Sequence, residues 1–139
     1  TDSILYWANK INPGIIFMHW QFDKPDHAAA AIASSKALAV NGMIYDHEVY
    51  YFGGLPGTLK EFEPDFYVNI SSVAEEKEAL VHLHESPIHE DGALVKSIME
   101  ENHSWGIPNG CEYAEGFRTH LAMINHRWNK KTRYSLLKL

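Results

Sequence analysis

The chain has 139 residues, which suits one domain of ordinary size, and 45% of them are apolar, enough for a buried core. Its 12 basic and 18 acidic residues give a formal net charge of −6, which argues against a nucleic-acid partner because such a surface is normally basic. No apolar run approaches the roughly 20 residues of a membrane span. A single cysteine excludes an internal disulfide and is compatible with a reducing, cytoplasmic location.

The first part of the chain predicts a helix, a strand and a second helix. Apolar residues at helical spacing indicate a helix that starts at residue 2 or 3 and stops at Asn12-Pro13-Gly14. The short apolar run 15–18 follows this turn and predicts a strand buried on both faces. Pro25 suits the first turn of a helix that continues to about Val40 and ends at Asn41-Gly42.

The rest of the chain continues to alternate strands and helices. Ser72 and Glu75 have the spacing of a capping box at the start of one of these helices. The expected strands are 49–52, 66–70 and 112–118, and the expected helices are 72–84 and 91–105. This order predicts one α/β domain over residues 1–139, with a Rossmann-like, mostly parallel sheet flanked by helices.

Polar side chains gather directly after the first predicted strand. In an open α/β sheet, ligands bind beyond the carboxyl ends of the strands. His19, Asp23, Lys24, Asp26 and His27 all fall there. His27 lies in the first turn of the next helix, where a neutral imidazole is a good zinc ligand and a nearby carboxylate can orient it. The alternative is that His27 and Asp26 are ordinary residues at the start of a helix and bind no metal.

The stretch Lys24-Pro25-Asp26-His27 resembles the His-Pro-Asp-His motif of PIG-L/LmbE-like zinc-dependent sugar de-N-acetylases. The resemblance implies that His27 binds zinc and that Lys24 and Asp26 are catalytic. Lys24 stands where the family has a histidine. A lysine can donate to an oxyanion but is a poor proton shuttle near neutral pH.

Three later segments resemble the same family, in the same order along the chain. They are 65–71 with the helix after it, His84-Glu85-Ser86, and Tyr113-Ala-Glu-Gly-Phe-Arg118. The resemblance implies that Tyr113 assists the oxyanion and that His84, Glu115 and Arg118 contact the substrate. From the residues alone, His84 and Glu115 have a simpler interpretation as structural, hydrogen-bonded groups.

The family's opening His-Pro-Asp-Asp-Glu motif, which supplies two zinc ligands and the base, has no match in this sequence. His27 alone cannot hold a metal. His19, Asp23, His82 and His84 are conceivable substitutes, but their spacing does not require this role. The chain starts at Thr1, and we expect either that an N-terminal part precedes it or that the protein is a shortened relative.

Two functions follow from the resemblance. The first is a zinc-dependent hydrolase that removes acetyl groups from N-acetylated amino sugars or glycoconjugates, provided that the N-terminal part exists. The second is a truncated or degenerate relative without catalysis that acts as an oligomeric or partner-binding scaffold. A homo-oligomer is expected in either case, with no nucleic acid or membrane as partner.

Overall fold

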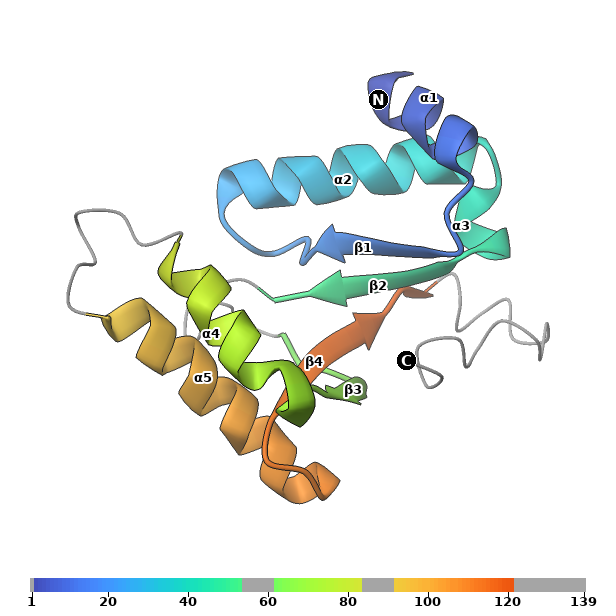
Figure 1. Cartoon of the computed structure of the whole chain (residues 1–139). Helices are drawn as coiled ribbons and strands as arrows, with labels where there is room; N and C mark the ends of the chain where they lie inside the picture. Colours follow the sequence, from blue (N-terminus) through green and yellow to red (C-terminus); the bar gives the residue numbers. More distant parts are fainter. Residues whose placement is uncertain (1, 54–61, 84–91, 122–139) are drawn as a thin grey trace.

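The computed structural model describes residues 2–53, 62–83 and 92–121. The first described segment forms most of the predicted elements and one short helix more. Its elements are α1 (Asp2–Ile11), β1 (Ile15–His19), α2 (Pro25–Val40), α3 (Met43–Asp46) and β2 (Glu48–Phe52). Gly42 precedes α3 with φ of 72°, a left-handed conformation that glycine adopts readily. Figure 1 shows α2 lying along β1, as expected for a helix that connects two parallel strands.

The other two segments form the second part of the fold. Their elements are β3 (Phe66–Asn69), the 3-10 turn η1 (Ser71–Val73), α4 (Ala74–His82), α5 (Ala93–Gly106), the 3-10 turn η3 (Ile107–Asn109) and β4 (Ala114–Thr119). The predicted capping box is wrong: the residue that precedes α4 is Val73, and no side chain in the described part of the chain caps it. Ser72 lies within η1, one residue before Val73, and so is not at the N-cap position of α4.

The four strands form one sheet in the order β1-β2-β4-β3. β1 pairs with β2 in parallel, whereas β4 runs antiparallel to both β2 and β3. The expected α/β class is confirmed, but the described sheet is mixed rather than mostly parallel. The physical reason lies in the connections: α2 returns the chain to the start of a parallel neighbour, whereas β4 inserts between two strands that both run the other way.

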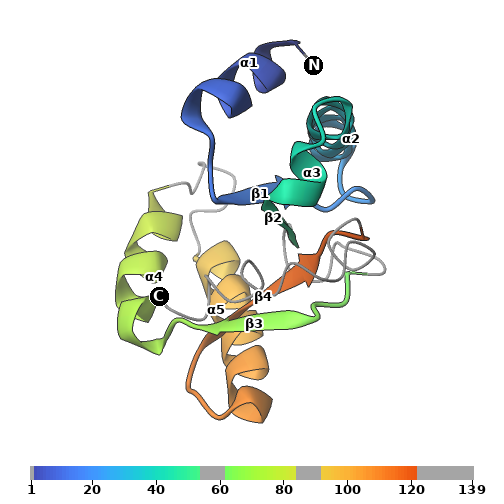
Figure 2. The ribbon, with the colours of Figure 1, turned by 90° about the vertical axis from the view of Figure 1, so that its right-hand side faces the viewer.

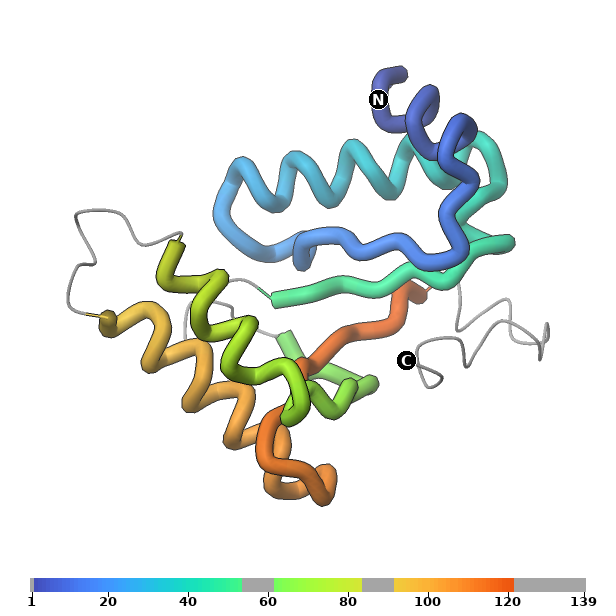
Figure 3. Tube along the Cα trace, in the orientation of Figure 1, coloured from blue at the N-terminus to red at the C-terminus, as the bar shows by residue number. Residues whose placement is uncertain are grey.

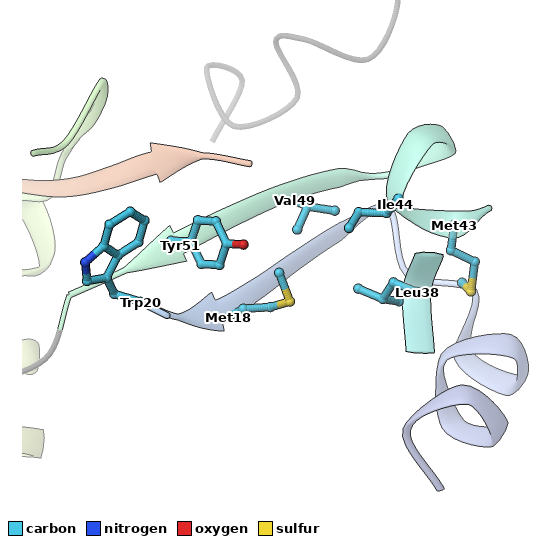
Figure 4. Close-up of a cluster of buried hydrophobic side chains, with 7 residues drawn as sticks. All are labelled: Met18, Trp20, Leu38, Met43, Ile44, Val49 and Tyr51. Atoms are coloured by element: carbon cyan, nitrogen blue, oxygen red, sulfur yellow. The ribbon is translucent and has the colours of Figure 1, made fainter. Parts of the chain in front are cut away.

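Two apolar clusters lie on opposite faces of the sheet. The first surrounds Leu38 and Val49 under α2 and α3, and Figure 4 shows its side chains gathered along β1 and β2. The second forms around Tyr50 and Phe117. The prediction that the first strand is buried on both faces is wrong, because Phe17 is 44% exposed. β1 is an edge strand of the described sheet, so fewer neighbours cover it.

The helices α4 and α5 belong to the β3–β4 side of the molecule. α5 contacts β4 and α4, and Figure 2 shows α5 behind β3 and β4, with α4 beside them. Gly116 makes this packing possible, since an added Cβ would lie 3.2 Å from the Trp105 ring and 2.7 Å from Pro64. Among the described residues, no helix has the length and apolar character to cross a bilayer.

Candidate metal centre

The carboxyl end of β1 places three potential metal ligands together. β1 ends at His19, a turn carries Asp23, and α2 brings His27 back in its first turn. Figure 3 shows the chain reversing here, from β1 through the turn into α2. Pro25 fixes the backbone for the first turn of α2. The chain reversal stacks the His27 ring on the His19 ring, with 4.1 Å between the ring centroids.

Asp23 is held firmly within this turn. Its Oδ2 lies 2.7 Å from His27 Nδ1, and its Oδ1 accepts a hydrogen bond of 2.6 Å from the Lys24 amide. The Asp23 side chain is only 2% exposed. Burial by itself raises the pKa of Asp23, but the hydrogen bonds from His27 and the Lys24 amide outweigh it, and the net pKa lies below its ordinary value. Asp23 is therefore ionised at neutral pH and is an acceptor for an N–H at His27 Nδ1; in the tautomer with the proton on Nδ1, the ring offers its Nε2 lone pair.

His19 is the second histidine of this site. Its ring also packs against Phe52, with centroids 4.6 Å apart, and its buried Nδ1 has no hydrogen-bond partner among the described residues. Burial lowers the pKa of His19, and the neighbouring His27 lowers it further. A neutral imidazole with an unpartnered buried nitrogen is suited to metal binding, because the metal ligand is the unprotonated ring.

His19, Asp23 and His27 each offer one donor atom, and these three atoms all lie within 4.8 Å of one another. Two imidazole nitrogens and a carboxylate oxygen form a ligand set typical of catalytic zinc. The residues present therefore fit the metal that the sequence resemblance implies. His27 was the predicted ligand, and His19 and Asp23 were named only as conceivable substitutes. The spacing of four between each successive pair was the available signal.

Lys24 and Asp26, the two residues expected to be catalytic here, lie at the rim of the centre. Lys24 is exposed and immediately precedes α2, and its contact with Asp23 is made through its backbone amide. The Asp26 side chain is 80% exposed, with Oδ2 4.0 Å from His27 Nε2. Asp26 is thus placed to face a ligand at His27, whereas Lys24 is tied to the centre by its main chain.

Tyr113 and Glu115 lie on the β3–β4 side of the molecule. Tyr113 packs its ring against His103, and its backbone bonds to Ser71. Glu115 pairs with Lys77 at 3.2 Å. These contacts join both side chains to α4 and α5, and the oxyanion role of Tyr113 and the substrate role of Glu115 stay predictions. His84 lies outside the described residues.

Arg118, the remaining predicted substrate residue, borders a cavity of about 410 Å³. Its guanidinium carbon lies 4.9 Å from the centre of the Trp20 ring. The cavity is lined by Trp20, Gln21, Phe22, Tyr51, Glu63, Arg118, Thr119, His120 and Leu121. Trp20 to Phe22 belong to the same turn that carries Asp23, so one short segment borders both the metal centre and the cavity.

Comparisons with known proteins relate this arrangement to a fold. The structure superposes on the conserved protein TT1542 from Thermus thermophilus, with a TM-score of 0.70 and 23% sequence identity. It also superposes on GalB, the 4-carboxy-2-hydroxymuconate hydratase from Pseudomonas putida, with a TM-score of 0.68 and 18% identity. In both cases the match covers 84% of this chain and 56% of the other chain. The chain shares the α/β fold of these two proteins. It spans little more than half of their length.

The comparisons correct the family assignment made from sequence. No family model matches the chain, and no curated protein matches it either. GalB, one of the two solved structures compared above, is a hydratase and not a deacetylase. The prediction from the short motifs that the chain is a PIG-L/LmbE-like N-acetylglucosaminyl deacetylase is therefore wrong. Those motifs indicate only the order of strands and helices that the chain shares with this fold.

Proposed function

We propose that the protein is a metal-dependent enzyme that activates water, with zinc held by His19, Asp23 and His27. The observation that carries the proposal is the close approach of three donors at the end of β1, where the buried His19 Nδ1 has no partner in the described part of the chain. A zinc ion bound there would lower the pKa of a coordinated water and polarise a substrate carbonyl.

Each residue of the centre has a distinct part in this proposal. Asp23 holds the proton on His27 Nδ1 and so directs the Nε2 lone pair outward, while its carboxylate is close enough to act as a third donor. His19 is kept neutral by burial. Asp26 is exposed beside His27 and is the carboxylate placed to accept a proton from water. Lys24 remains a proposed donor to a developing oxyanion.

Two reactions of activated water are candidates. The first is hydrolysis of the N-acetyl group of an amino sugar or glycoconjugate, in which the metal-polarised group is an amide carbonyl. The second is hydration, which the similarity to GalB favours because that protein is a hydratase with this fold. The chain spans only 56% of the length of these two neighbours. Both the hydrolase activity and the hydratase activity are therefore proposals for the whole protein.

Metal analysis tests the shared premise of both reactions. We expect about one zinc per chain after loading and dialysis, and loss of that zinc in His19→Ala and in His27→Ala. His103→Ala, which removes an exposed histidine of α5, is the matched control and should retain the metal. Zinc content unchanged in both site variants would refute the centre. A protein that binds no zinc would favour the non-catalytic scaffold.

Activity assays then separate the two reactions. Release of acetate from N-acetylglucosamine and its glycoconjugates would support the hydrolase, and disappearance of the conjugated absorbance of an unsaturated acid would support the hydratase. Asp26→Asn should reduce turnover while leaving zinc content unchanged, because Asp26 faces the centre from its exposed rim. If Asp26→Asn converts substrate at the wild-type rate, Asp26 is not the general base.

Self-association is a separate proposal. Several large apolar side chains of α1 are exposed, including Trp7 at 53% and Ile11 at 66%. Contiguous exposed apolar surface often marks a contact with another chain. Sedimentation velocity over a range of concentrations tests the expected homo-oligomer, and a monomer throughout that range would refute it.

A further inference from the structure

The outer side of β1 is an open strand edge in the described sheet. β1 stands first in the order β1-β2-β4-β3, so among the described strands only β2 lies beside it. An open edge presents a row of backbone amides and carbonyls that can pair with a further strand. The residues on this edge therefore decide what can bind there.

The hydrogen bonds between β1 and β2 show which residues face the open side. β1 bonds to β2 through Gly14 O at one end, at 3.2 Å, and through the Trp20 amide at the other, at 3.1 Å. Successive residues of a strand turn their backbone groups to opposite sides, so the alternate residues between these two continue the same ladder. The amides and carbonyls of Ile15, Phe17 and His19 consequently point away from β2.

We propose that this open edge is the self-association surface of the protein, where β1 of a second copy pairs with it antiparallel about a two-fold axis at Phe17. The proposal rests on the self-association proposed above and names its surface. Phe17 is the middle residue of the strand Ile15–His19. Pairing about this residue sets Phe17 opposite Phe17 of the second copy and Ile15 opposite His19, so every outward backbone group meets an outward group.

The Phe17 side chain favours this pairing. It is 44% exposed, although one side of its ring packs on Phe117 with the centroids 5.2 Å apart. In a hydrogen-bonded antiparallel pair the two Cα atoms lie about 5.5 Å apart, with both side chains on one face of the sheet. The two Phe17 rings would thus contact each other, and such aromatic cross-strand pairs are stabilising.

The helix α1 extends the same surface. Figures 1 and 2 show α1 at the β1 end of the molecule, far from α4 and α5. Its large side chains Tyr6, Trp7 and Ile11 are 58%, 53% and 66% exposed. A two-fold axis perpendicular to the sheet makes the two α1 helices antiparallel, so their exposed apolar faces can cover each other across the axis.

The charges of this surface are self-complementary. Residues 2–19 contain one acidic residue, Asp2, and one basic residue, Lys10, whereas the whole chain carries a net charge of −6. The acidic excess therefore lies elsewhere, and two copies can meet here without the repulsion of their net charges. Asp2 begins α1 and Lys10 lies in its last turn, so antiparallel helices bring each carboxylate to an ammonium of the other copy.

Amide hydrogen exchange reads this surface without any substitution. The Met18 amide faces β2 and should be protected at every protein concentration, whereas the Phe17 amide should exchange about tenfold more slowly where sedimentation velocity shows the dimer than where it shows the monomer. A protein that stays monomeric refutes self-association as a whole. A dimer with an unprotected Phe17 amide refutes this surface alone.

A proline on the open edge gives a second test. Because the Phe17 amide points away from β2, Phe17→Pro removes no bond between β1 and β2, and proline is tolerated on edge strands. It should weaken dimerisation about tenfold or more, since the amide is lost and the ring blocks the incoming strand. Phe17→Ala keeps the amide and is the matched control, which should dimerise more tightly than Phe17→Pro. Circular dichroism checks the fold of both, and wild-type dimerisation of Phe17→Pro would overturn the proposal.

A charge exchange on α1 tests the antiparallel arrangement. Lys10→Glu should weaken dimerisation several-fold, because two acidic residues then meet at each end of the helix pair. Adding Asp2→Lys should restore it, although both changes are unfavourable for the dipole of an isolated α1. A double variant that dimerises no better than Lys10→Glu would refute the pairing of the two helices.

Discussion

Asp23 Oδ2 lies 2.7 Å from His27 Nδ1, one helical turn further along the chain. This contact links the turn after β1 to the start of α2 and places a carboxylate acceptor against Nδ1 of His27. The Lys24 amide completes the environment of the carboxylate. Most of the chemistry proposed for this protein depends on the position of this one buried side chain.

Replacing Asp23 by asparagine should change how stability depends on pH. The folded pKa of Asp23 lies below its ordinary value of 3.8, so the carboxylate stabilises the fold above that value and loses this effect as the pH falls through the lowered folded pKa. We expect wild type to be more stable than Asp23→Asn at pH 7, by about 1–3 kcal/mol, with the gap closing below about pH 4. Urea unfolding from pH 3 to 7 measures the stability difference between wild type and Asp23→Asn. Asp46→Asn, at the exposed end of α3, is the control. A gap that does not change with pH would contradict the prediction.

Removing the His19 imidazole should act in a higher pH range. Burial holds the folded pKa of His19 below its ordinary value of 6.5. As the pH falls below that value, the unfolded chain takes up the proton first, so the wild type loses stability, whereas full stability is present above it. His19→Phe should lack this component of the decline. Thermal unfolding between pH 5 and 8 compares the two proteins, with His103→Phe as the control; identical slopes for wild type and His19→Phe would refute the assignment.

Gly106 should tolerate no side chain. A Cβ there would lie 2.5 Å from the backbone oxygen of Glu112 and 2.8 Å from that of Cys111, and backbone cannot move aside cheaply. We expect Gly106→Ala to lower the free energy of unfolding by about 1–3 kcal/mol. Gly14→Ala is the matched control, since its Cβ would meet nothing within 4 Å in the described structure. Equal urea midpoints for the two variants would show that the turn after α5 is looser than described.

Leu38 should be among the costliest side chains to truncate. It is 2% exposed and packs in the cluster between α2 and the sheet. Leu38→Ala should cost about 2–5 kcal/mol, because it leaves a cavity that the surrounding side chains only partly fill. Leu80 of α4 is 60% exposed, so Leu80→Ala should fall within about 0.5 kcal/mol of wild type. Chemical denaturation of both variants tests the ranking, and a Leu38→Ala cost below that of Leu80→Ala would contradict it.

Much of the local structure was predictable because its signals act over a few neighbouring residues. Pro25 and the Asn41-Gly42 pair mark the ends of α2, and the structure places that helix at Pro25–Val40. The apolar run before His19 likewise became β1. A proline in the first turn of a helix and a glycine after its last turn act through their own backbone torsions. These two signals therefore predict the ends of a helix without any distant contact.

The candidate site was predictable only in part. His27 stood out because it follows a strand end and opens a helix, and the structure adds that Asp23 and His19 lie against it. The roles of Tyr113 at the oxyanion and of Glu115 at the substrate came from the family resemblance alone and stay predictions. The structure adds only their neighbours: Tyr113 packs against His103 of α5, and Glu115 pairs with Lys77 of α4.

By itself, the sequence determined the α/β class, the order of the main helices and strands, and the polar turn after the first strand. Only the tertiary structure decided that β4 inserts between β2 and β3 in the opposite direction. It also decided that Arg118 lies over Trp20. Propensities and caps are set by adjacent residues, whereas strand order and contacts between distant segments are set by how the apolar faces pack together, and that packing has no signature in any short stretch of the chain.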